Sequence, residues 1–307
     1  MSDTTEQKRK TDPKAFLSII RPQNCIIGGL TVLAGIAIAH QVTNVWSSLG
    51  ANWLVFLYGY ITYFFVAAGG NVVNDIFDIE IDKINRPHRA LPSGRISVTQ
   101  AWIYVIILSL LGVFFAWLNG IIGAIIVIVF LVVGYAYAAK VKELGLAGNF
   151  MVAFSFAFGV IYGSIIYAEQ VGVWVIPVPS WLFFLTAFMI LQARETIKGS
   201  EDVEGDALRD VRTIARVYGY RAAAGVQAVL NLVGVICYSL IWLLGFASWD
   251  LWLLLLLGDG VVLGAAIAPL MGPSEKKKLL IGSTLDKIGA LIGLIAFVII
   301  PLYGVVF

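Results

Sequence analysis

Two clusters of acidic side chains, half a chain apart, repeat one spacing within a largely apolar sequence. An i, i+4, i+8 series drifts by only about 40° per step around a helix, so each cluster would form one row of oxygen atoms on a helix face. Like charges at this spacing destabilise a helix, and carboxylates beside a bilayer core are costly, so folding does not favour either row. We therefore interpret the two rows as a site for divalent cations. The first row is Asn74, Asp78 and Asp82, with Asp75 beside Asn74, and the second is Asp202, Asp206 and Asp210.

Basic side chains flank both rows. Hard cations such as Mg²⁺ take carboxylate and amide oxygens and often share their remaining positions with substrate phosphates. Guanidinium and ammonium groups also pair with phosphate oxygens. Acids, a metal and cations together indicate a diphosphate site, whereas a single acidic run would indicate only a solvated loop. Lys83, Arg86 and Arg89 follow the first row, and Arg194, Lys198, Arg209 and Arg212 surround the second.

The composition sets the class of fold that must position these groups. Of the 307 residues, 60% are hydrophobic and 13% are charged, whereas about a quarter are charged in soluble proteins. A span of the bilayer core needs about 20 apolar residues, and only helices or closed barrels satisfy their backbone in lipid. We predict an all-α, polytopic membrane protein with nine transmembrane helices in one bundle and both acidic rows at its cytoplasmic end. The predicted spans are 20–41, 52–73, 99–118, 120–139, 147–168, 180–197, 221–246, 249–271 and 284–306.

The domain organisation follows from the same pattern. The polar residues 1–15 are predicted to form a flexible cytoplasmic tail, and residues 16–307 a single transmembrane domain. Within it, the first acidic row lies in a loop at 74–98 and the second in a loop at 194–216.

Lys and Arg residues are sorted between the two sides of the predicted membrane. The four loops on the side away from the N-terminus, around 42–51, 119–120, 169–179 and 247–250, contain none. By the positive-inside rule, the N-terminus and both acidic rows face the cytoplasm and the C-terminus lies outside a cell membrane. The Lys and Arg residues between the spans lie on the N-terminal side. They are found in the tail, in the loops 74–98 and 198–221, and at Lys140, Lys142, Lys276, Lys277 and Lys278.

Longer motifs around the acidic rows resemble a known family. Residues 74–94 contain N-D-x-x-D-x-x-x-D followed by N-x-P-x-R and P-S-G, which is similar to the first signature of the UbiA superfamily of intramembrane prenyltransferases. Residues 194–206 contain R-E-x-x-K and E-D-V-E-G-D, and most resemble the archaeal digeranylgeranylglyceryl phosphate synthase branch. Arg21-Pro-Gln-Asn24 and the segment Tyr137 to Lys142 also resemble family elements. The resemblance covers essentially the whole chain.

This resemblance implies roles for the candidate residues. Asn74, Asp78 and Asp82 would hold one Mg²⁺, and Asp202 with Asp206 a second, the two ions bridging an isoprenyl diphosphate; Asp78, Asp82, Asp202 and Asp206 are the implied catalytic carboxylates. Gly199 stands where that branch often has an aspartate, so either Asp202 and Asp206 suffice for the second ion or Asp210 and Glu201 contribute. The residues implied to bind diphosphate or phosphate are Arg21, Asn24, Arg86, Arg89, Tyr137, Lys140, Lys142, Arg194 and Lys198.

The implied reaction is ionisation of the diphosphate to an allylic carbocation, with cations stabilising the leaving group. Aromatic rings that attract a cation include Tyr58, Tyr63, Phe154, Phe158 and Tyr162. The expected acceptor is lipid-like, geranylgeranylglyceryl phosphate, and the alternative is an aromatic ring as in quinone or chlorophyll pathways. A secondary transporter is less favoured because transporter sites lie near the bilayer midplane.

The partners expected from the sequence are the bilayer, the polyprenyl diphosphate and the acceptor, and no nucleic acid. Oligomeric state stays open, since Gly28, Gly29 and Gly35 would serve packing either within one molecule or between two.

Overall fold

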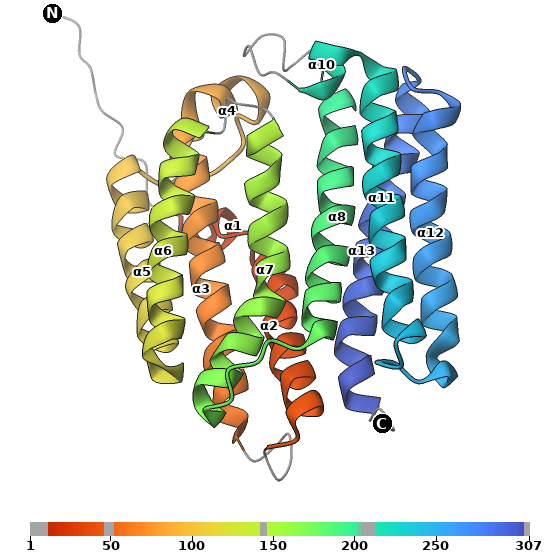
Figure 1. Ribbon diagram of the computed structural model, residues 1–307. Coiled ribbons are helices and arrows are strands. Elements are labelled where there is room, and N and C mark those ends of the chain that lie inside the picture. The colour runs from red at the N-terminus through yellow and green to blue at the C-terminus, as the bar shows by residue number, and fades with distance from the viewer. Residues whose placement is uncertain (1–11, 46–51, 142–145, 202, 204–212, 304–307) are drawn as a thin grey trace, which may run out of the picture.

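The computed structural model describes residues 12–45, 52–141, 146–201, 203 and 213–303, and within these ranges the chain is helical and contains no strand (Figure 1). The all-α prediction is confirmed. The first half contains α1 (Pro13–Ile19), α2 (Pro22–Thr43), α3 (Trp53–Phe77), α4 (Ile79–Asn85), α5 (Val98–Asn119), α6 (Ile121–Ala136), the π-helical turn η2 (Tyr137–Val141) and α7 (Leu146–Val171). The second half contains α8 (Val178–Glu201), α10 (Ile214–Tyr218), α11 (Tyr220–Leu243), the 3₁₀ turn η4 (Trp249–Leu251), α12 (Trp252–Met271) and α13 (Lys276–Tyr303).

Local sequence explains where several of these helices begin. Pro22 opens α2 and restricts the preceding residue, and Arg21 adopts a left-handed conformation with φ of 52°. Ser97 and Gln100 form a capping box at the start of α5. Gly120, with φ of 146°, makes the one-residue turn between α5 and α6.

The long helices lie side by side in two groups (Figure 1). In the first group, α3 packs against α2 and α5, and α2 packs against α7. In the second group, α11 packs against α8 and α12, and α13 packs against α8 and α12. Helix α8 also packs against α7, so it joins the two groups.

The number of membrane spans remains a prediction. Eight helices in the described part of the chain are long and apolar enough to cross a membrane. The remaining predicted span, 180–197, the sixth in chain order, falls within α8, whose last two turns before Glu201 carry Arg194, Glu195 and Lys198 and are therefore less apolar.

Glycines allow α2 to approach its neighbours closely. A Cβ atom on Gly35 would lie 2.0 Å from the carbonyl oxygen of Val160, and one on Gly163 would lie 2.2 Å from that of Val32. Gly159 and Gly163 of α7 form the G-x-x-x-G spacing that favours close helix packing in membranes. Gly28 and Gly29 face Tyr63 and Tyr60 of α3, so all three α2 glycines pack against other helices of the same molecule.

Two predicted boundaries differ from the structure. Helix α1 starts at Pro13, inside the predicted tail 1–15, because Asp12 caps it and Ala15 is fully buried. The predicted loop at 74–98 is half helical, since Asn74 belongs to α3 and residues 79–85 form α4. Residues 1–11 of the tail lie outside the described residues.

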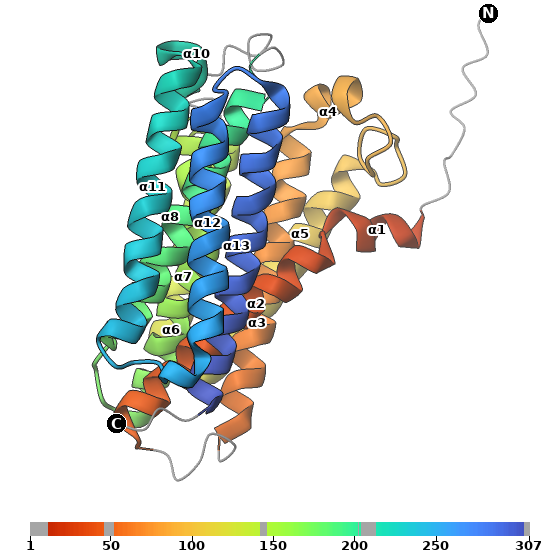
Figure 2. The same ribbon diagram turned by 90° about the vertical axis from the view of Figure 1, so that its right-hand side faces the viewer.

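The first acidic row lies at one end of the bundle. Helix α4 and the short helix α10 occupy this end, while α1 projects sideways from the bundle (Figure 2). The C-terminal end of α8 reaches the same end of the bundle (Figure 1). The fold therefore brings the first row and the start of the 194–216 segment to one face of the membrane bundle.

Candidate active site

A cavity of about 410 Å³ lies between α3, α6 and α7 and has a polar end and an apolar end. Its volume is within the range of pockets that hold small-molecule ligands. Asn74 and Thr62 line it at positions twelve residues apart on α3, which is about 18 Å along a helix axis. The polar end is lined by Asn24, Asn71, Asn74, Tyr137, Arg194 and Glu195, and the apolar walls include Val66, Ala67, Val127, Phe130, Leu131 and Phe158.

A buried hydrophobic cluster lies next to the cavity. Tyr162 lines the cavity and belongs to this cluster, which also includes Val55 of α3, Ala116 of α5 and Ile166 of α7. The described charged side chains that line the cavity are Arg194 and Glu195.

The first acidic row keeps its helical register through the break between α3 and α4. The backbone N–H of Asp78 donates to the Asn74 carbonyl at 3.0 Å, and that of Asp82 donates to the Asp78 carbonyl at 2.8 Å. Asn74, Asp78 and Asp82 therefore follow one another at successive turns, as the spacing predicted. Asp78 itself has φ of −91° and ψ of 2°, which is where α3 ends and α4 begins.

Two arginines pair with carboxylates of this region. Arg89 Nη1 lies 2.6 Å from Asp82 Oδ2 and 3.2 Å from Asp75 Oδ1, and Arg21 pairs with the same Asp75 oxygen. Both aspartate side chains are only 5% exposed. We call Arg21, Asp75, Arg89 and Asp82 the ion cluster. In this state the predicted phosphate ligands Arg21 and Arg89 bind carboxylates of the same motif.

The remaining predicted phosphate ligands lie in different surroundings. Asn24 and Tyr137 line the cavity, and Tyr137 lies within electrostatic reach of Asp78 and Glu195. Arg86 is exposed at the end of α4, and Lys198 is half-buried on α8. Lys140 belongs to the π-helical turn, without a described side chain, and Lys142 lies outside the described residues.

The second motif contributes Arg194 and Glu195 to the cavity wall. Arg194 Nη1 donates to Glu195 Oε1 at 2.7 Å. Glu195 and Asn71 were not among the predicted site residues; the R-E-x-x-K motif contains Glu195, whereas the sequence gives no signal for Asn71. Asp202, Asp206 and Asp210 lie outside the described residues.

The polar end suits a hard cation. Within the described ranges, no three His, Cys, Asp or Glu side chains are grouped to hold a metal. Asn74, Asp78 and Glu195 nevertheless bring amide and carboxylate oxygens to this end, and Mg²⁺ needs few protein ligands because it keeps several waters. The oxygen set present fits Mg²⁺, and Asp82, which contacts Arg89 through Oδ2, could add its other carboxylate oxygen.

Of the aromatic residues expected to face a carbocation, Tyr63, Phe158 and Tyr162 line the cavity. Tyr58 instead packs on Phe115 with ring centroids 5.9 Å apart. Phe154 packs between other phenylalanines, including Phe184 at 5.7 Å.

The described helices form a membrane bundle whose pocket joins Arg194 and Glu195 to a long apolar wall, an arrangement suited to an amphiphile with a charged head. Residues 29–278 match the model of the UbiA prenyltransferase family, and the chain belongs to this family. It is an intramembrane prenyltransferase, as the two motifs led us to expect.

Individual relatives agree with this assignment. The digeranylgeranylglyceryl phosphate synthase of Sulfurisphaera tokodaii is 33% identical over 253 residues, covering 79% of this chain and 86% of the relative. A solved structure concerning digeranylgeranylglyceryl phosphate synthase in membranes is 29% identical, with a TM-score of 0.77 over 94% of this chain and 98% of that one. A UbiA homologue from Archaeoglobus fulgidus bound to DMAPP and Mg²⁺ is 16% identical, with a TM-score of 0.63 over 93% of this chain and 99% of that one, and shares the fold.

Proposed function

We propose that this prenyltransferase moves a geranylgeranyl or similar polyprenyl group from its diphosphate to the hydroxyl of a lipid-like acceptor, geranylgeranylglyceryl phosphate, in a Mg²⁺-dependent reaction. The observation that carries the proposal is the cavity, which joins Asn74, Arg194 and Glu195 to apolar walls and is lined by α3 over about 18 Å of helix. The name of the Sulfurisphaera tokodaii relative supports this acceptor.

The donor fits the cavity in one orientation only. Its apolar tail would lie between α3, α6 and α7 against Val127, Phe130 and Leu131, because these walls offer no polar partner. Its diphosphate would then lie at Asn74 and Asp78. The extent of these apolar walls would limit the length of tail that the pocket accepts.

The metal ligands that we propose are Asn74, Asp78 and Asp82 for one Mg²⁺ and Asp202 with Asp206 for a second. Bound Mg²⁺ would offset the negative charge that grows on the leaving diphosphate. Arg21, Arg86, Arg89 and Lys198 are the proposed further cations for this group, and Arg21 and Arg89 would reach it by exchanging carboxylates of the ion cluster for phosphate oxygens.

The walls of the cavity protect the reactive intermediate. When the allylic C–O bond breaks, its electron pair leaves with the diphosphate and the allyl group becomes a cation. The rings of Tyr63 and Phe158 line the cavity and attract positive charge, and the apolar walls exclude water that would hydrolyse the cation. The acceptor oxygen then forms the new C–O bond and its hydroxyl proton is released.

The positive charge near the cavity favours a phosphate-bearing acceptor over a neutral aromatic one. Geranylgeranylglyceryl phosphate carries its own phosphate, and Arg194, with Lys140, Lys142 or Arg21, would bind it. A neutral aromatic acceptor would leave this many cations without a partner, which makes it the second candidate.

We also propose that the polar end of the cavity faces the cytoplasm of a cell membrane. In support, α4, α10 and the start of α13 at Lys276 lie at one end of the bundle (Figure 1), and basic residues concentrate in those segments.

A turnover assay tests the reaction and the acceptor together. Purified protein receives geranylgeranyl diphosphate and Mg²⁺ with either geranylgeranylglyceryl phosphate or 4-hydroxybenzoate, and Asp78→Ala and EDTA serve as controls. We expect product from the glyceryl phosphate alone, abolished by Asp78→Ala and by EDTA. Product from the aromatic acceptor alone would overturn the acceptor, and product that persists in EDTA would overturn the Mg²⁺ requirement.

A further inference from the structure

The connection between α1 and α2 contains a strained residue. Arg21 has φ of 52° and ψ of 64°, a left-handed conformation that residues other than glycine rarely take. It also precedes Pro22, and the residue before a proline favours an extended backbone instead. Strained backbone persists only where the surrounding structure holds it, and such sites cluster where function needs a particular geometry. The contacts that hold Arg21 therefore indicate what its conformation serves.

The peptide group that precedes Arg21 is held from α3. Asn71 Nδ2 donates to the Ile20 carbonyl at 2.8 Å, and Cys25 Sγ donates to the same oxygen at 3.2 Å. At the other end of this peptide group, the backbone N–H of Arg21 donates to the Ser18 carbonyl at 3.3 Å. A change in φ of Arg21 would rotate the peptide group and break these bonds. The hydrogen bonds at its two ends therefore fix the left-handed conformation.

The side chain of Arg21 is held from the same helix. Its guanidinium pairs with Asp75 Oδ1, and Asp75 follows Asn71 by four residues, so both lie on one face of α3. Asn71 lines the cavity together with Asn24, which comes three residues after Arg21. One face of α3 therefore holds Arg21 twice at the margin of the cavity, through its backbone and through its side chain.

We propose that Asn71 is a positioning residue: its amide holds the Ile20 carbonyl and so keeps the Arg21 guanidinium beside the polar end of the cavity, where it binds a phosphate group of a substrate. A phosphate that replaces Asp75 at Arg21 breaks the contact through the side chain. The contact from Asn71 is to the backbone and stays intact during this exchange. This inference rests on the phosphate-binding role proposed above for Arg21.

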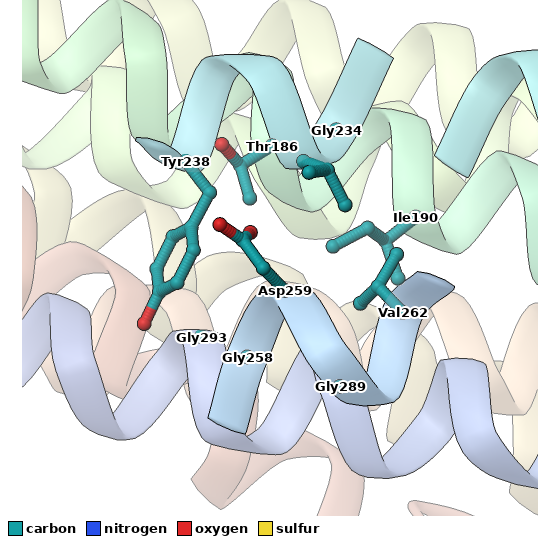
Figure 3. A pocket seen from close by; sticks show the side chains of 10 residues that line it. Thr186, Ile190, Gly234, Tyr238, Gly258, Asp259, Val262, Gly289 and Gly293 are labelled. Carbon is teal, nitrogen blue, oxygen red and sulfur yellow. The ribbon is translucent and has the colours of Figure 1, made fainter. Parts of the chain in front are cut away.

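Two polar residues outside the cavity provide controls. Asn119 Nδ2 of α5 donates to the Val55 carbonyl of α3 at 3.3 Å, so it joins an amide to a carbonyl as Asn71 does, and neither residue lines the cavity. Asp259 of α12 points into a separate void of about 10 Å³, room for roughly one water, which Thr186 also lines (Figure 3). These residues test whether the loss of any polar group in the bundle has the same effect.

The first experiment measures the apparent KM of geranylgeranyl diphosphate and of geranylgeranylglyceryl phosphate with the purified enzyme. We expect Arg21→Gln to raise one of these KM values about tenfold, and Asn71→Ala to raise the same one about fivefold, with a smaller change in kcat. Asn71→Gln keeps an amide donor and should bring that KM to within about twofold of the wild-type value. Asn119→Ala and Asp259→Asn should leave both KM values unchanged.

The double variant tests whether Asn71 acts through Arg21. If it does, Arg21→Gln combined with Asn71→Ala raises KM no further than Arg21→Gln alone. Cys25 provides a second test, because it donates to the same carbonyl but is fully buried and does not line the cavity. Cys25→Ala should raise the same KM, and Cys25→Ser, which keeps a donor, should not. This pair serves in place of Asn71→Ala if that variant does not fold, and no rise in Cys25→Ala would contradict the inference.

The outcomes are distinguishable. If Arg21→Gln raises a KM but Asn71→Ala does not, or if the two effects multiply in the double variant, Asn71 does not position Arg21. If Asn119→Ala or Asp259→Asn raises that KM equally, the effect belongs to any lost polar group and the inference is overturned. If Arg21→Gln leaves both KM values unchanged, the phosphate-binding role of Arg21 is wrong and the inference falls with it. No turnover of these substrates by the wild-type enzyme would instead overturn the proposed function.

Discussion

Asp75 is the residue through which the first motif is tied to the rest of the molecule. It pairs with Arg21, just before α2, and with Arg89, beyond α4, although the motif itself runs from α3 into α4. A buried carboxylate shared by two guanidinium groups is more sensitive to loss than a surface pair, because its removal leaves buried charge uncompensated. Asp75 therefore holds the position of Asn74 and Asp78 by tethering the segments around them.

We predict that Asp75→Asn lowers stability by about 3 kcal/mol, the usual scale for breaking a buried ion pair. Thermal unfolding in detergent measures this as a lowered Tm. The matched control is Glu80→Gln, since Glu80 is 82% exposed and pairs with Lys83 at 2.7 Å on the surface of α4. An equal loss in the two variants would contradict the tethering role of Asp75.

The spacing of Asn74, Asp78 and Asp82 was sufficient to predict that they follow one another on successive helical turns. The pairing of Arg89 with Asp75 and Asp82 was not predictable, because it depends on the chain folding back after Arg86, and no periodic pattern encodes that turn.

Individual helices differ in how well hydropathy located them. The predicted span 52–73 ends before α3, which continues to Phe77, and the predicted span 284–306 begins eight residues after α13 does. Hydropathy marks the part of a helix that lipid can surround, whereas backbone hydrogen bonding continues into the polar interface. The acidic row begins on such an extension, so a helix rather than a loop carries Asn74.

Helix α6 has one face toward the cavity and another toward lipid. A larger side chain on the first face would narrow the cavity, whereas a larger side chain on the second face would not. Val127 lines the cavity and is 5% exposed, whereas Val129 on the same helix is 52% exposed. We predict that Val127→Phe lowers kcat/KM for geranylgeranyl diphosphate by roughly 10- to 100-fold relative to a shorter prenyl diphosphate.

Competition between the two diphosphates in one assay measures this preference directly. Val129→Phe should leave the preference unchanged, because its ring would enter lipid. If both variants shifted the preference alike, the tail would not occupy the pocket between α3, α6 and α7.

At the scale of the whole molecule, the cavity belongs mainly to the first of the two helical groups. Helices α3, α6 and α7 line it, and α8 is the one helix of the second group whose described residues do so. Helices α11 and α13 pack against α8, and α12 packs against both of them. The all-helical membrane bundle followed from the sequence, and so did the position of the first acidic row and of the C-terminal end of α8 at one end of it. The division between the two groups did not, because it depends on which helices touch.

Orientation in the membrane is a testable property of the whole bundle. In a variant with Cys25 and Cys237 replaced by alanine, we predict that a membrane-impermeant maleimide labels Val175→Cys in intact cells, because in the proposed orientation the segment between α7 and α8 faces outside. Lys277→Cys, at the start of α13, should be labelled only after the cells are permeabilised. Labelling of Lys277→Cys and not Val175→Cys in intact cells would reverse the proposed orientation.

The position of the polar end has a consequence for the lipid that the proposed reaction would make. Asn74 and Arg194 both line the cavity at this end, so the charged heads of donor, acceptor and product would lie on one side of the bilayer. Carrying a charged headgroup through hydrocarbon is costly, so the product would accumulate in the leaflet in which it was formed. Synthesis would therefore be one-sided, and supplying the opposite leaflet would require a separate activity that moves lipids across the bilayer.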